Sequence, residues 1–123
     1  MFDKLIERLT QTPETIRATN LQKWAESIPG TTRIEDIEPR CGCKAVGIIQ
    51  KIRIDPRTGT GSVEVTLDDG TGKLVAKWLG RSKLNGIALG KGLEVEATAG
   101  DHAGEEMVVL NPSYRLMPGP DGG

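Results

Sequence analysis

The sequence predicts an all-β domain, a small barrel of five strands preceded by short N-terminal helices. Three observations lead to this fold class. Strand-like runs recur at regular spacing between residues 41 and 110 and are separated by glycine-containing turns. Two of these runs flank the turn at residues 68–72, Asp-Asp-Gly-Thr-Gly, which is a strong hairpin signal. The chain has 123 residues, which is enough for one domain with a single core.

Residues 1–39 are predicted to form a helical N-terminal appendage. A second helix is expected to begin at Thr12-Pro13, because a capping hydroxyl precedes a proline at the first helical position, and to end at Pro29-Gly30. A first helix is expected from the apolar stripe of Phe2, Leu5, Ile6 and Leu9. Isolated helices need about 12–15 residues, so we expect both to pack on the barrel as a cap. Docking of another chain is the alternative.

Residues 40–116 are predicted to form the barrel, and residues 117–123 a disordered tail. The five predicted strands are residues 41–54, 62–67, 73–79, 93–98 and 107–110. Both faces of the long first strand are apolar, so we expect it to bend near Gly47 and to serve two sheets. A long first strand, a hairpin, a short linker and two further strands are typical of the five-stranded OB-fold Greek-key barrel.

Several short motifs follow one another through the predicted barrel. They are Asp69-Gly70-Thr71-Gly72, Trp78-Leu79-Gly80-Arg81, Gly86-Ile87, Gly90 and Asn111-Pro112-Ser113-Tyr114-Arg115-Leu116. In this order they resemble small actinobacterial OB-fold proteins of the nucleic-acid-binding, anticodon-binding type, which also carry a helical segment ending in Pro-Arg, as Pro39-Arg40 does here. The turn and the closing Asn-Pro-x-Tyr also resemble the wedge domain of RecG-type helicases. The resemblance implies nucleic-acid binding, although OB barrels also bind proteins and sugars.

Basic side chains are the main candidates for a binding site. In OB barrels strands two and three and the loops after strands one and four form the binding face, where cations contact phosphates and release counterions. Aromatic side chains would stack on bases if they are exposed, although the parity of Trp78 with Leu74 and Ala76 favours the core. An ordinary solvated surface is the alternative for the cations. The candidate nucleic-acid-binding residues are Lys44, Lys51, Arg53, Arg57, Lys77, Trp78, Arg81, Lys83, Tyr114 and Arg115.

Other classes of function find no support in the sequence. The chain has one histidine, His102, and no Ser/His/Asp set, HExxH or P-loop pattern, so we expect no enzyme. Cys41 and Cys43 lie one residue apart and are expected to be structural thiols, so we expect neither a metal nor a cofactor. The sequence has no apolar run of about 18 residues and no signal peptide, so we expect a cytoplasmic protein without a membrane partner.

The expected function is therefore non-catalytic binding of single-stranded DNA or RNA, or of a nucleic-acid junction, with low sequence specificity. The alternative is a protein–protein interaction module that docks on a larger assembly through the barrel face or through residues 1–39. The near-even balance of 16 basic and 17 acidic residues and the few aromatic side chains favour this alternative.

Overall fold

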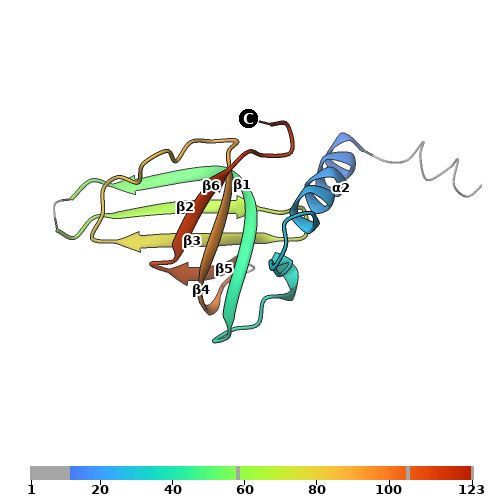
Figure 1. Ribbon diagram of the computed structural model, residues 1–123. Coiled ribbons are helices and arrows are strands. Elements are labelled where there is room, and N and C mark those ends of the chain that lie inside the picture. Colours follow the sequence, from blue (N-terminus) through green and yellow to red (C-terminus); the bar gives the residue numbers. More distant parts are fainter. Residues whose placement is uncertain (1–11, 58, 105, 123) are drawn as a thin grey trace, which may run out of the picture.

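The computed structural model describes residues 12–57, 59–104 and 106–122, which form a β-barrel with one α-helix beside it (Figure 1). The elements in chain order are α2 (Pro13–Glu26), η1 (Ile34–Asp36), β1 (Gly42–Asp55), β2 (Ser62–Asp68), β3 (Lys73–Leu79), β4 (Gly92–Ala103), β5 (Glu106–Leu110) and β6 (Ser113–Met117). The first predicted helix, with Phe2 and Leu5, lies outside the described residues.

Five strands close into a ring in the order β1-β2-β3-β5-β4, with β4 pairing back to β1. The β3–β5 pair is parallel and the other pairs of the ring are antiparallel. This arrangement confirms the predicted all-β fold class of the OB-fold type. It brings β2 and β3 side by side, so their outward side chains share one surface.

The long strand β1 belongs to both halves of the barrel, as predicted. Its first half pairs with β4, its second half pairs with β2, and Ile48 is opposite residues of both partners. Gly47 is next to this switch, where a Cβ would lie 2.9 Å from Leu67 Cβ, so the close approach of the two strands requires glycine. A register shift between Ile49 and Lys51 adds a local bend.

Alternating side chains from all five ring strands fill the barrel. Val63, Val65 and Leu67 of β2 point inward and are at most 1% exposed. The inward positions of β3 are likewise buried, including Trp78. These strands therefore direct their other parity, which carries the charged side chains, to the outer surface.

The segment after β5 forms a sixth strand, β6, beyond the five strands that the sequence predicts. Asn111 adopts φ 50°, and the chain turns there before β6 pairs antiparallel with β4. The indole Nε1 of Trp78 donates to the carbonyl of Pro112 at 2.9 Å and holds this turn on the core. Met117, the first residue of the predicted tail, pairs with Gly92, and Gly119 is buried.

Helix α2 begins as predicted, with the hydroxyl of Thr12 accepting the N–H of Thr15 at 3.1 Å and Pro13 in the first turn. The helix packs outside the barrel at the end where β2 turns into β3 (Figure 1). There the amide of Gln22 donates to the carbonyl of Gly70 at 2.9 Å. A Cβ on Gly70, which has φ +86°, would lie 2.3 Å from the carbonyl oxygen of Ala18.

The carboxylate of Asp69 joins this hairpin turn to the linker that follows α2. Asp69 is 1% exposed. Its Oδ2 accepts the N–H of Ile34 in η1 at 2.9 Å. Its Oδ1 accepts the N–H and the hydroxyl of Thr71 at 2.8 and 2.6 Å and the N–H of Gly72 at 3.2 Å. One buried side chain thus satisfies donors from two segments that lie 35 residues apart.

Candidate nucleic-acid interface

The outer surface of β1, β2 and β3 carries four cations in adjacent rows. Arg53, Glu64 and Lys77 are opposite one another across the three strands, and Lys51 lies two residues along β1 from Arg53. Lys73 starts β3 and, with Lys51 and Arg53, lines a hollow of about 360 Å³. We call the surface formed by Lys51, Arg53, Lys73 and Lys77 the basic face.

The charge of the basic face is moderate. None of the ion pairs between described residues uses any of its four cations. Four carboxylates lie among or beside them: Glu64 and Glu106 line the same hollow, Asp68 is opposite Lys73, and Asp55 lies near Lys77. Asp55 is paired with Arg57. Without that pair the excess is one positive charge, so cations are available to phosphates but the long-range attraction of a polyanion is weak.

Three predicted residues border the basic face at the end of the barrel away from α2 (Figure 1). Arg57 lies in the β1–β2 loop, where its guanidinium binds Asp55 through Nη2 and Oδ2 at 2.7 Å. This hydrogen bond lowers the pKa of Asp55 and raises that of Arg57. Arg81 and Lys83 are exposed in the connection after β3, which is held near the loop by the Gly80 N–H and Gly61 carbonyl at 2.8 Å.

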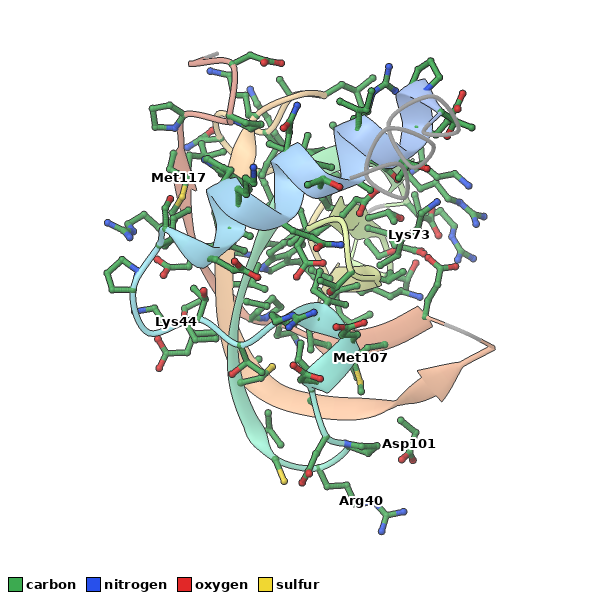
Figure 2. The ribbon with its side chains drawn as sticks, turned by 90° about the vertical axis from the view of Figure 1, so that its right-hand side faces the viewer. Arg40, Lys44, Lys73, Asp101, Met107 and Met117 are labelled. Atoms are coloured by element: carbon green, nitrogen blue, oxygen red, sulfur yellow. The ribbon has the colours of Figure 1, made fainter. Side chains whose placement is uncertain are left out.

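Lys44 and Arg115, by contrast, lie on another side of the barrel. Figure 2 shows Lys44 on the left and Lys73 on the right of the view, both below α2. Lys44 Nζ is 3.4 Å from Oε1 of Glu94, and Arg115 Nε is 2.9 Å from Oε2. The side chain of Glu94 is 7% exposed, so both cations neutralise a buried carboxylate. The expectation that they would share one binding surface with Lys51 and Lys77 is therefore wrong.

The two predicted aromatic residues belong to the core. Trp78 is 3% exposed, as its parity predicted, and its ring meets Tyr114 edge to face at a centroid distance of 5.5 Å. Tyr114 is half-buried and packs against the same core cluster. A base could reach Trp78 only if the core opened, so the stacking role considered for Trp78 does not hold.

Sequence reasoning missed two features of this surface. Lys73 has the same parity as Lys77 on β3, so the alternation that places Lys77 on the outer surface also predicts that Lys73 lies there. Leu79 and Leu110 are 50% and 55% exposed next to Lys77, with Lys77 opposite Leu110 on β5. We call Leu79 and Leu110 the aliphatic patch. The sequence reasoning considered only aromatic side chains for contacts with bases, although aliphatic side chains can also contact them.

The thiols and the metal-ligating side chains provide no second site in the part of the chain that the structure describes. Cys41 is exposed and Cys43 is buried, and burial raises the pKa of the Cys43 thiol. No group of three or more His, Cys, Asp or Glu side chains within residues 12–57, 59–104 and 106–122 is placed to hold a metal ion. Within the same ranges, no helix has the length and apolar character to cross a bilayer.

Comparison with known proteins finds similar solved structures, and the similarity to RecG supports the fold. The chain is similar to part of RecG in a structure bound to a three-way DNA junction, with a TM-score of 0.60, 18% identity, and coverage of 73% of this chain and 13% of that chain. It is also similar to a chain of a Replication Protein A heterotrimer bound to ssDNA, with a TM-score of 0.48 and 17% identity over 80% of this chain and 76% of that chain. No protein-family model and no curated protein matches the chain.

Proposed function

We propose that this protein is a non-catalytic OB-fold module that binds single-stranded DNA or RNA on its basic face with low sequence specificity. The observation that carries the proposal is the position of Lys51, Arg53, Lys73 and Lys77. They lie over β1, β2 and β3, on the side that OB barrels use for oligonucleotides, and form no ion pair with a described residue. RecG, which shares the fold over part of its length, is seen on a DNA junction.

The aliphatic patch favours a single strand over a duplex. Leu79 and Leu110 expose apolar surface directly beside Lys77. Bases of a single strand can turn toward such side chains while the phosphates face the cations, whereas the bases of a duplex are stacked inside the helix. The small charge excess implies weak binding that salt reduces further. A cytoplasmic location is part of the same proposal.

Oligonucleotide binding at several salt concentrations tests the proposal. Fluorescence anisotropy with labelled single strands and duplexes measures the affinity for each. The single strand should bind more tightly than the duplex, and its affinity should be higher at about 50 mM salt than at about 200 mM. Each phosphate contact on a single strand contributes about 0.7 to the slope of log K against log salt. Replacing two cations, Lys51→Gln/Lys77→Gln, should therefore reduce this slope by about 1.4.

The matched control removes two exposed cations that lie elsewhere, Lys23→Gln/Arg40→Gln. Figure 2 shows Arg40 at the bottom of the view, well below Lys73. The control should leave the slope unchanged within about 0.3, because it removes no phosphate contact. Absence of single-strand binding by the wild type at the lower salt, or equal effects of both double variants, contradicts the proposal.

A second candidate function is protein docking, favoured by the same exposed leucines and the small charge excess. In that case the barrel face or residues 1–39 bind a partner in a larger assembly. Leu79→Ser/Leu110→Ser should then abolish partner capture that survives nuclease treatment. Loss of capture on nuclease treatment excludes this alternative.

A further inference from the structure

A cavity of about 510 Å³ lies between α2, β1 and the C-terminal segment. Its apolar lining comes from Ile16 and Leu21 of α2, Ile48 of β1, and Pro120. The helix contributes two polar side chains, Arg17 and Asn20, β1 contributes Gln50, and the C-terminal segment contributes the carboxylate of Asp121. This volume falls in the range of about 300–1,000 Å³ that is usual for small-ligand sites, which combine apolar walls with a few polar groups.

Gln50 connects this cavity to the basic face. The same side chain lines the 510 Å³ cavity and the hollow formed by Lys51, Arg53 and Lys73. Its Nε2 donates to Oδ2 of Asp68 at 2.7 Å, which fixes the orientation of the amide. A primary amide carries a carbonyl oxygen and a second N–H besides the one in use, so Gln50 has one acceptor and one donor to offer a ligand.

We propose that this cavity binds one unstacked nucleobase of a strand whose phosphates lie on the basic face. The inference rests on the proposed function and adds a base-reading position to it. The aliphatic walls from Ile16 and Ile48 suit the flat apolar faces of a base. The amides of Gln50 and Asn20 suit its hydrogen-bonding edge, because single-stranded bases are read on that edge. Arg17 stands at the same cavity and suits the neighbouring phosphate.

Continuity with the basic face and the chemistry of the polar groups favour this occupant. A strand held by Lys51 and Lys73 passes directly beside Gln50, which lines the same hollow. Two neutral amides and the Asp121 carboxylate offer donors and acceptors to a base edge, and the cations of the adjoining hollow suit its anionic backbone. A purely apolar occupant, such as the Phe2 and Leu5 stripe of the same chain, would offer no hydrogen-bond partner to the amides of Gln50 and Asn20.

The test compares four labelled homo-oligonucleotides of equal length with the full chain. The wild type should prefer one base by about 10-fold, since a bidentate base contact discriminates by about 1–3 kcal/mol. Asn20→Ala/Gln50→Ala should reduce the preference to less than about 2-fold and change the salt slope by less than about 0.5, because no phosphate contact is lost. Asn85→Ala, which removes an exposed amide from the β3–β4 connection, is the matched control and should preserve the preference.

A second variant keeps the test informative if the amide variant is unstable. Ile16→Ser removes an apolar wall of the cavity at a side chain that is 48% exposed, and it should also reduce the base preference. Binding of all four oligonucleotides without preference overturns the inference and leaves the proposed function intact. Absence of any binding at low salt removes the proposed function itself. A preference that survives both variants, with lower thermal stability of full-length Leu5→Ser, assigns the cavity to the chain's own N-terminal residues and also overturns the inference.

Discussion

Replacing Asp69 by alanine should cause a large loss of stability without touching the apolar core. The carboxylate accepts four hydrogen bonds: from the N–H groups of Ile34, Thr71 and Gly72, and from the hydroxyl of Thr71. Alanine removes every acceptor at a position that is 1% exposed. The bond to Ile34 is buried, so water does not readily replace it there.

The expected magnitude follows from these partners. A hydrogen bond to a charged acceptor contributes about 1.5–3 kcal/mol, and the Ile34 N–H should lose most of this amount. Thr71 and Gly72 are half-buried, so water can replace part of their bonds, and together they add about 1 kcal/mol. We therefore expect Asp69→Ala to lower the free energy of unfolding by about 3 kcal/mol. Asp69→Asn keeps one acceptor oxygen and should lose about half as much.

Urea unfolding followed by circular dichroism measures both variants. The matched control is the neighbouring Asp68→Ala, which also removes accepted hydrogen bonds but at a half-exposed side chain, and should cost about 1 kcal/mol. Amide hydrogen exchange at Ile34 should accelerate in Asp69→Ala and not in Asp68→Ala. A loss below about 1 kcal/mol in Asp69→Ala, or equal losses in the two alanine variants, would refute the argument that this buried carboxylate holds η1 on the hairpin.

Three further predictions concern single substitutions. Gly70→Ala should lower the melting temperature and move α2, because a Cβ there meets the helix backbone at 2.3 Å and the residue has φ +86°; an unchanged melting curve contradicts this contact. Trp78→Phe should lower the free energy of unfolding by about 1–2 kcal/mol, because the 2.9 Å hydrogen bond to Pro112 is lost. The affinity for oligonucleotides, measured by anisotropy, should stay constant. Arg57→Gln should raise the pKa of Asp55 in an NMR titration, since Arg57 lowers it. The stabilisation from this pair is present above the unfolded-state pKa of Asp55 and is lost as pH falls through the lowered folded-state pKa. The variant should therefore be less stable than the wild type above the unfolded-state pKa of Asp55 and equally stable below the folded-state pKa.

The barrel was predictable because its signals are local. Alternation in β2 and β3 fixes which side chains point inward, and the Asp-Gly turn fixes their register, so the outward placement of Lys77 followed from parity. Lys51 and Arg53 share the parity of the buried Ile49, and only the register shift between Ile49 and Lys51 turns them outward. The cap at Thr12 and Pro13 was readable for the same reason.

The remaining features depend on contacts between distant segments, which no local pattern encodes. Lys44 has the parity of a surface residue, but only the pairing of β1, β4 and β6 reveals that it and Arg115 neutralise Glu94. Likewise, the short run after Asn111 gives too weak a strand signal for β6. The wall of the 510 Å³ cavity combines residues from α2, β1 and the segment around Pro120, which are widely separated in the sequence.

Strand β6 covers one edge of the first half of β4. It lies along β4, and with β1 it supplies the two cations that hold Glu94. Proteolytic removal of the chain from Pro112 onward would free one edge of β4, remove a cation from a buried carboxylate, and break the anchor of the Trp78 indole. Cleavage between β5 and β6 should therefore destabilise the fold far more than cleavage in the β1–β2 loop. Limited digestion followed by gel filtration can compare the chains cleaved at these two places.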